Sequence, residues 1–206
     1  MSGTYVVIEG ADGTGKSTQL ALLAQHLEAQ GIDYVEFSEP EGTPISNEIR
    51  GVIKNGSLER AAATNLLLFT AARHEIWHKV ALPALAQDKW VIASRNYFST
   101  LVYQGFAEGL DQELITSLTR SFTDERYMTP DKTLILSLPD TTTRQSRITQ
   151  RGRLNHPDTF EARDEGFQVA LHDGYMQLAT NLHLPIINAD RPAPVVFEDI
   201  KVALGL

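Results

Sequence analysis

The sequence predicts an α/β fold, in which helices cover both faces of a parallel β-sheet. Short runs rich in β-branched residues alternate with longer segments of helical periodicity, an order typical of parallel sheets. The short runs are bounded by glycine, proline or charged residues, as expected for strands that are buried on both faces. The predicted strands are residues 5–10, 34–37, 90–94, 133–138 and 184–190.

Two segments between these strands have clear helical character. Residues 17–31 place four apolar side chains on one face, and the segment ends at Gly31, a residue type that commonly follows a helix C-terminus. Residues 61–87 predict one long helix. A bend is expected near Pro83, because proline cannot donate the hydrogen bond that a continuing helix needs.

Length and composition restrict the class of protein. A chain of 206 residues suits one domain, predicted to span 1–206, with an arginine-rich lid insertion at about 147–165. The net charge of −8 argues against a broad nucleic-acid or membrane surface. The chain has no cysteine, which excludes disulfides, thiolate nucleophiles and cysteine zinc sites. Neither a leader segment nor a run of 18 apolar residues is found, so a cytoplasmic location is expected.

The stretch GADGTGKST, residues 10–18, matches the phosphate-binding pattern G-x-x-x-x-G-K-[ST]. A predicted strand precedes it and a predicted helix follows it, which is the context that this pattern requires. The glycines allow backbone N–H groups to surround a phosphate at a helix N-terminus. The residues predicted to bind ATP are Gly10, Ala11, Asp12, Gly13, Thr14, Gly15, Lys16, Ser17 and Thr18. Lys16 supplies charge to the phosphates, and the Ser17 hydroxyl is a candidate Mg²⁺ ligand.

A second motif competes with this interpretation. HEIWH, residues 74–78, matches H-E-x-x-H, in which two histidines bind zinc beside a general-base glutamate. The sequence identifies no third ligand, and a zinc hydrolase would leave the glycine loop unexplained. A zinc hydrolase using His74, Glu75 and His78 is therefore kept as a remote alternative, and surface or interface histidines are preferred.

Four further segments occur in the order and spacing of one known family. These segments are SEPEGTPISNEIR (38–50), LLLFTAARHEIWHKVALPAL (66–85), SRNYFSTLVYQG (94–105) and RGRLNHPDTFE (151–161). Together with the glycine loop, they make the chain resemble the thymidylate (dTMP) kinase family over nearly its whole length. The resemblance implies a P-loop NTPase fold with a five-stranded parallel sheet and a homodimer. It also implies an enzyme that transfers the ATP γ-phosphoryl group to dTMP, giving dTDP.

The resemblance also implies an acceptor site. Phe69 matches the phenylalanine on which the pyrimidine stacks, and Arg73 would hydrogen-bond the base or the acceptor phosphate as a fixed fork. Arg95, after the third predicted strand, is interpreted as a phosphate contact because ligands bind at the carboxyl ends of parallel strands. The remaining substrate-binding candidates are Asp12 (sugar 3′-hydroxyl), Glu39, Pro40, Ser99, Tyr103 and Gln104.

Catalysis is assigned to five residues by the same resemblance. Family members whose glycine loop lacks arginine use arginines of the lid to neutralise the transferring phosphoryl group. Arg151 and Arg153 are the candidates here, and Lys16, Arg95 and Asp12 complete the predicted catalytic set. The partners implied are ATP and a deoxynucleoside monophosphate, with Mg²⁺ as cofactor.

The chain departs from the family at the predicted phosphate and metal edge. Ser94 replaces the aspartate that usually precedes Arg95. Serine also stands at 38 and 137, and Glu41 replaces a glycine. One explanation is that Mg²⁺ is held by Ser17, the phosphates and water, with Asp12 and Glu39 in the outer shell. The others are an acceptor with another or modified base, and a nucleotide-binding P-loop protein without catalysis.

Overall fold

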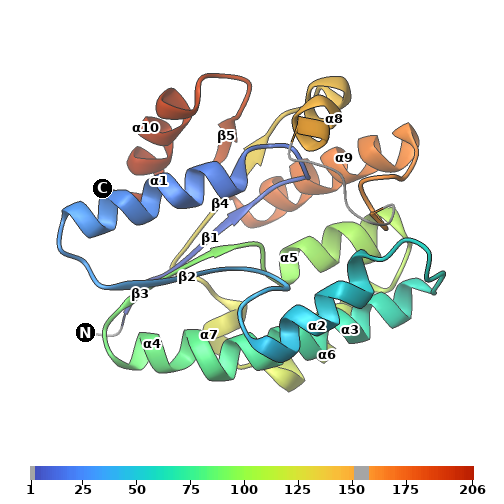
Figure 1. Cartoon of the computed structure of the whole chain (residues 1–206), viewed down its shortest axis with the longest axis horizontal. Helices are drawn as coiled ribbons and strands as arrows, with labels where there is room; N and C mark the ends of the chain where they lie inside the picture. Colours follow the sequence, from blue (N-terminus) through green and yellow to red (C-terminus); the bar gives the residue numbers. More distant parts are fainter. Residues whose placement is uncertain (1–2, 151–157) are drawn as a thin grey trace.

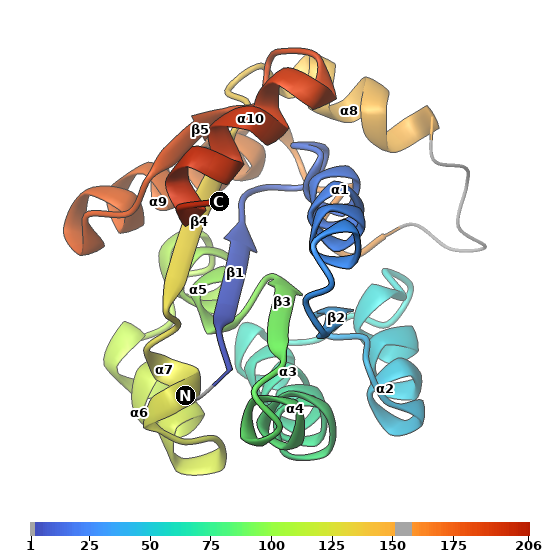
Figure 2. The same cartoon turned by 90° about the vertical axis from the view of Figure 1, so that its left-hand side faces the viewer.

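The computed structural model describes residues 3–150 and 158–206. Within them, five strands form one parallel sheet in the order β2-β3-β1-β4-β5 (Figures 1 and 2). The sheet and its flanking helices confirm the predicted α/β P-loop architecture. The strands are β1 (Tyr5–Glu9), β2 (Tyr34–Ser38), β3 (Trp90–Ser94), β4 (Lys132–Ser137) and β5 (Ile186–Asn188).

Helices cover both faces of the sheet (Figure 1). One face carries α1 (Lys16–Ala29) and α10 (Ala193–Leu204). The opposite face carries α2 (Pro44–Lys54), α3 (Ala62–Ile76), α4 (Leu82–Ala86), α5 (Tyr97–Thr100), α6 (Gln112–Phe122) and α7 (Glu125–Met128). α9 (Glu165–Leu182) packs against β4 and against the π-helical segment η2 (Leu101–Ala107), and α8 (Thr141–Gln150) lies beside α9. In the described parts of the chain, none of the helices has the length and apolar character that crossing a bilayer requires.

The alternation of side chains along β1 divides the core between the two faces. Val6 and Ile8 join the cluster beneath α1 and α10, whereas Tyr5 and Val7 join the cluster beneath α4 and α7. All four of these side chains are fully buried. A strand that is apolar on both faces is the pattern of a central parallel strand, and β1 accordingly lies at the middle of the sheet.

The long helix predicted over 61–87 is present but is interrupted. α3 runs into the π-helical turn η1 (Trp77–Ala81), and α4 follows with Pro83 in its first turn. Proline fits the first turn of a helix, because the N–H that it lacks would have no partner there. The interruption expected at Pro83 therefore takes the form of the π-helical turn η1, which lies just before this proline.

The predicted lid segment is only partly described. Residues 147–150 form the last turn of α8, so the start of the predicted lid is helical. After residues 151–157, Asp158 pairs with Asn55 at the end of α2 through an isolated bridge. Lys54 binds the same segment through ion pairs of 2.6 Å to Asp158 and 3.4 Å to Glu161.

The strand register brings the polar candidates together. Ser94 at the end of β3 is opposite both Ile8 of β1 and Ser38 of β2. Glu9, Glu39 and Arg95 each follow one of these three positions along the chain. Because parallel strands end at the same edge, these side chains converge at the carboxyl edge of the sheet.

Candidate active site

The glycine loop leads from β1 into α1 with three glycines at positive φ. The φ angles are 142° at Gly10, 83° at Gly13 and 97° at Gly15, values that L-residues with a side chain rarely adopt. A Cβ on Gly13 would also lie 2.6 Å from the carbonyl oxygen of Arg144, so the loop passes close to α8. Glycine is therefore required here both for conformation and for space.

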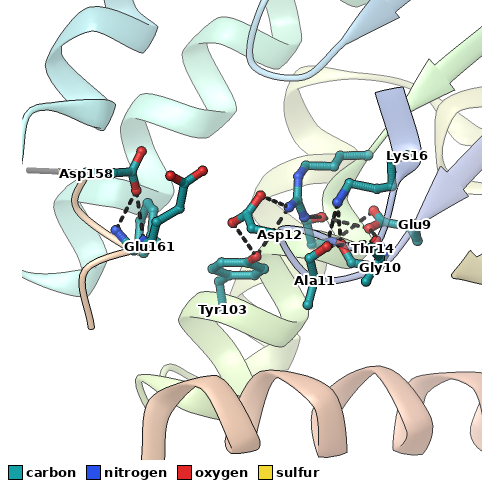
Figure 3. Close-up of polar contacts among 12 residues, drawn as sticks. Glu9, Gly10, Ala11, Asp12, Thr14, Lys16, Tyr103, Asp158 and Glu161 are labelled. Carbon is teal, nitrogen blue, oxygen red and sulfur yellow. Dashed lines mark hydrogen bonds and ion pairs between the residues drawn. The ribbon is translucent and has the colours of Figure 1, made fainter. Parts of the chain in front are cut away.

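Lys16 lies folded over this loop. Its Nζ donates to the carbonyl oxygens of Gly10 and Ala11, each at 2.8 Å (Figure 3). The side chain is buried, whereas Ser17 and Thr18 at the start of α1 are exposed. The ammonium group is thus held at the position where the loop would enclose a phosphate.

Arg95 and Asp12 form an ion pair that joins the end of β3 to the glycine loop. Arg95 Nη2 lies 2.7 Å from Asp12 Oδ1, and the Tyr103 hydroxyl donates to Asp12 Oδ2 at 3.0 Å (Figure 3). The Arg95 guanidinium also donates to Ser99 Oγ at 2.8 Å. The carboxylate that the sequence lacks at position 94 is therefore supplied to Arg95 by the loop.

The cations around Asp12 keep this carboxyl ionised. Burial by itself would raise the pKa of Asp12. The positive charges of Arg95, Lys16 and Lys54 outweigh that effect and hold the pKa well below its usual range. Asp12 is therefore a hydrogen-bond acceptor at every pH at which the protein would normally be assayed.

Glu9 is a site residue that the sequence analysis missed. Its side chain is fully buried. The carboxylate accepts hydrogen bonds from the backbone N–H groups of Asn96 (2.9 Å) and Ser99 (3.1 Å), and from the hydroxyls of Ser99 (2.7 Å) and Tyr175 (2.9 Å). These bonds fix the turn in which Arg95 has a φ of 74°. A lone acid ending the apolar run YVVIE was the available signal, but the contact with Tyr175 lies 166 residues away.

A second buried cluster surrounds Arg73. Its Nε donates to Glu39 Oε2 at 3.1 Å and to the Tyr127 hydroxyl at 2.7 Å, and its Nη2 donates to Thr100 Oγ1 at 3.0 Å. Arg73 is only 1% exposed. Burial raises the pKa of Glu39, and the charge of Arg73 opposes that rise. Tyr127 and Thr100 were not singled out from the sequence, because neither belongs to a motif that marks it as polar and buried.

A pocket opens between these two clusters. Phe69 lines it, with its ring 6.2 Å from that of Phe160. The other lining residues are Asp12, Glu39, Pro40, Ile53, Lys54, Arg73, Arg95, Asn96, Ser99, Thr100, Tyr103 and Gln104. Every residue predicted to bind the acceptor therefore lines one pocket, together with several that were not predicted.

Three polar atoms of residues that line this pocket are buried without a hydrogen-bond partner among the described residues. They are Nη1 of Arg73 and Nδ2 of Asn96, which are donors, and Oε1 of Gln104, an acceptor. Leaving such atoms unpaired costs about 1–3 kcal/mol each, so they favour a ligand that offers both acceptors and a donor.

A neighbouring cavity of about 280 Å³ is lined by residues with side-chain oxygens, which include Asp12, Ser17, Glu39, Glu41 and Ser94. The cationic residues Lys16, Arg50, Lys54 and Arg95 also line it, so the cavity suits phosphate oxygens together with a metal ion. Among the described residues, no group of three or more His, Cys, Asp or Glu side chains could hold a metal ion. Sparse oxygen ligands suit Mg²⁺, which keeps several of its waters and is often shared with substrate phosphates.

Some predictions remain open or lose support in the structure. Arg151 and Arg153 lie outside the described residues, so nothing is added to their predicted role. His74 Nδ1 donates to the carbonyl oxygen of Phe122 at 2.7 Å, and Glu75 pairs with Lys79 at 2.5 Å. These contacts use the side chains that a zinc site would need. Arg144, which was not predicted, is 2% exposed beside the loop, and burial lowers its pKa.

Comparisons with known proteins agree with this geometry. The family model described as Thymidylate kinase matches residues 8–200. The thymidylate kinase of Exiguobacterium sibiricum is 39% identical over 180 residues, covering 87% of this chain and 82% of that protein. That of Ectopseudomonas mendocina is 38% identical over 207 residues, covering 99% of this chain and 96% of that protein. A crystal structure of thymidylate kinase from Ehrlichia chaffeensis matches with a TM-score of 0.78 and 26% identity, covering 100% of both chains.

Proposed function

Since this chain belongs to the thymidylate kinase family, we propose that it transfers the γ-phosphoryl group of ATP to dTMP, releasing ADP and dTDP. The observation that carries the proposal is the meeting of two sites at the carboxyl edge of the sheet. The glycine loop supplies a phosphate cradle, and the Phe69 pocket supplies an acceptor site. The Arg95–Asp12 ion pair lies where the two sites join. The whole chain, 1–206, is assigned to this one kinase domain.

The reaction requires positioning and charge rather than proton transfer. A phosphate oxygen of dTMP attacks the γ-phosphorus of ATP, and the bond from that phosphorus to the β,γ-bridging oxygen breaks. The nucleophile is already anionic at neutral pH, so no general base is needed. Lys16 and the loop amides hold the donor, and Arg95 holds the acceptor phosphate. Arg151 and Arg153 are assigned to the transferring group.

The acceptor base would be bound by two of the unpartnered atoms of the pocket, Arg73 Nη1 and Gln104 Oε1. Thymine presents a carbonyl oxygen, O4, beside a donor, N3–H. Arg73 Nη1 would donate to O4, and Gln104 Oε1 would accept from N3–H. Cytosine presents an amino donor and a ring nitrogen acceptor at the same places, so it would set donor against donor and acceptor against acceptor. Stacking on Phe69 completes the base site.

Mg²⁺ is proposed as the metal cofactor, held by Ser17 and shared with the phosphates. Asp12 and Glu39 act as outer-shell acceptors for its waters. When bound, the ion would neutralise charge on the phosphates of ATP. The chain's own contribution is to leave room for the ion and to hold the loop that presents the Ser17 hydroxyl.

The position of Ser94 gives a direct test of the metal assignment. We expect Ser94→Asp to lower the Mg²⁺ concentration for half-maximal activity by roughly thirtyfold, since a unit charge about 4 Å from a doubly charged ion is worth on the order of 2 kcal/mol even in a water-like medium. Activity titrated with Mg²⁺ at fixed ATP measures the effect. Ser94→Asn, which has nearly the same shape without the charge, is the matched control. An unchanged Mg²⁺ dependence in Ser94→Asp would show that residue 94 is not near the ion.

A panel of acceptors tests the function itself. Purified protein with ATP and Mg²⁺ is offered dTMP, dUMP, dCMP, dGMP and modified pyrimidine monophosphates, and ADP release is measured. We expect dTMP to be phosphorylated with the highest kcat/KM. A higher kcat/KM for a modified base would reassign the acceptor. ATP binding with no turnover of any acceptor would instead identify a non-catalytic nucleotide-binding protein.

We further assign the chain to a cytoplasmic homodimer. Support for a dimer comes from the apolar side chains exposed on the neighbouring helices α3 and α6, which are Leu67, Leu114 and Phe122. The cytoplasmic assignment follows from the substrates, because ATP and deoxynucleotides are pooled there. Sedimentation of the wild-type chain and of Leu67→Glu tests the dimer. We expect a dimer for the wild-type chain and a monomer for Leu67→Glu, and a wild-type chain that sediments as a monomer would refute the assignment.

A further inference from the structure

The amide of Gln104 has an orientation that the structure itself determines. Gln104 is fully buried in η2, and its Nε2 donates to Glu108 Oε2 at 3.2 Å, four residues further along. An ionised carboxylate has no hydrogen to donate, so the Gln104 atom that faces it must be the NH₂ group. The amide oxygen is therefore the atom left without a partner in the pocket.

Glu108 is itself held in place. Its side chain is 10% exposed, and its other oxygen, Oε1, accepts from Arg163 Nη1 at 3.1 Å. The Arg163 guanidinium also lies over the ring of Phe167, 4.3 Å from the ring centroid. One oxygen of the Glu108 carboxylate thus accepts from Arg163, which precedes α9, and the other accepts from Gln104.

We infer that Glu108 is a specificity-determining positioning residue, which fixes the Gln104 amide so that the pocket accepts thymine and rejects cytosine. This inference rests on the proposed function. With the amide turned over, Gln104 would place its oxygen about 3 Å from the Glu108 carboxylate, and two acceptors would face each other. The Gln104 side chain would then present a donor to the pocket. Glu108 never touches the base and acts only through Gln104.

The test compares three acceptors in variants that alter only this contact. Glu108→Gln keeps the shape of the side chain but can donate as well as accept, so either orientation of Gln104 is permitted. We expect the ratio of kcat/KM for dTMP to that for dCMP to fall by about tenfold, as for the loss of one hydrogen-bond preference. The ratio for dTMP to dUMP is expected to stay at the wild-type value. Thymine and uracil present the same O4 and N3–H, so a pocket that is merely loosened would change both ratios.

Two further variants separate the roles of the contacts. Arg163→Gln removes the ion pair but leaves the carboxylate on Gln104, and we expect it to retain the dTMP to dCMP ratio. In a Gln104→Leu background, Glu108→Gln is expected to have no effect on this ratio, because the amide through which it acts is gone. Dissociation constants of dTMP and dCMP, measured by calorimetry without ATP, give a binding readout for Glu108→Gln that does not depend on turnover.

Each failure has a distinct meaning. Equal losses for dTMP and dCMP in Glu108→Gln, or a loss of discrimination in Arg163→Gln as large as in Glu108→Gln, would overturn the inference about Glu108. The proposed function would be untouched by either result. Wild-type protein that turns over neither pyrimidine would instead overturn the proposed function, before any variant is compared.

Discussion

Lys16→Ala is expected to lower kcat for dTMP phosphorylation by about 10²–10³-fold, the range seen when one preorganised electrostatic group is removed from an active site. Lys16 Nζ lies 2.8 Å from two loop carbonyl oxygens, so the charge is positioned over the phosphate cradle. The negative charge that develops on the phosphates of ATP would lose the cation that the loop presents. Single-turnover measurements at saturating ATP and dTMP report the chemical step.

Two controls accompany this variant. Lys16→Met retains most of the aliphatic stem and should lose as much activity as Lys16→Ala, because the stem is not the group that acts. Lys16→Arg keeps a charge on a bulkier, planar group and tests whether a point charge is required. Thermal unfolding of all three variants shows whether the loop is still folded. A kcat within tenfold of the wild-type value in Lys16→Met would contradict the assigned role.

Arg95→Ala is expected to lower kcat/KM for dTMP by about 10²–10³-fold. ATP affinity should be nearly unchanged, because the ATP-binding loop keeps its own glycines and Lys16. Arg95 contributes the cation that meets Asp12 at 2.7 Å and Ser99 at 2.8 Å, at the junction of the two sites. Acceptor kinetics together with an ATP dissociation constant measure the two effects separately. If acceptor kinetics are unchanged, Arg95 is structural only.

The backbone at Arg95 supplies a matched control. Its φ of 74° is unfavourable for any residue with a Cβ, and Arg95→Ala keeps that strain while removing the guanidinium. Arg95→Gly removes both. We expect Arg95→Gly to unfold with a free energy about 1 kcal/mol higher than Arg95→Ala, and to be equally inactive. Urea unfolding measures the difference. Unequal activities would show that the turn, rather than the guanidinium, controls turnover.

The Arg95–Asp12 ion pair also leads us to expect that the effect of Arg95→Ala on stability depends on pH. The pKa of Asp12 is lowered in the folded chain, so this carboxylate stabilises the fold above its unfolded pKa of about 3.9. That stabilisation is lost as pH falls toward the lowered pKa. Arg95 is the first of the cations that lower it. The difference in unfolding free energy between wild type and Arg95→Ala should therefore be largest near pH 6 and shrink toward pH 3.

Local patterns in the sequence were sufficient to predict much of the fold. The five apolar runs match the five strands closely at both ends, except for the last. That run was predicted over 184–190, but β5 spans only Ile186–Asn188. An edge strand pairs on one side only, and apolar composition does not show where that pairing stops. The π-helical turn before Pro83 was predicted only as a bend, since hydrogen-bond geometry depends on how α3 and α4 pack.

The residues of the substrate pocket were harder to predict from local sequence patterns. Residues carried by motifs, such as Phe69 and Arg73, line the pocket as expected. Glu9, Tyr127 and Tyr175 were missed because the Glu9 carboxylate and the two tyrosine hydroxyls bind partners that lie 54 to 166 residues away in the sequence. Nothing in a local pattern distinguishes such residues from ordinary core or strand-end positions.

The sequence by itself determined the phosphate loop, the positions of the strands along the chain and the family to which the chain belongs. Each depends on residue types at short, fixed spacings, such as the glycines, which adopt positive φ without a steric penalty. Only the tertiary structure decided which carboxylate pairs with Arg95, since Asp12 and Arg95 are 83 residues apart and meet where β1 and β3 end together. It likewise decided which end of the Gln104 amide faces the pocket, because the direction of an amide depends on its neighbour and not on its own identity.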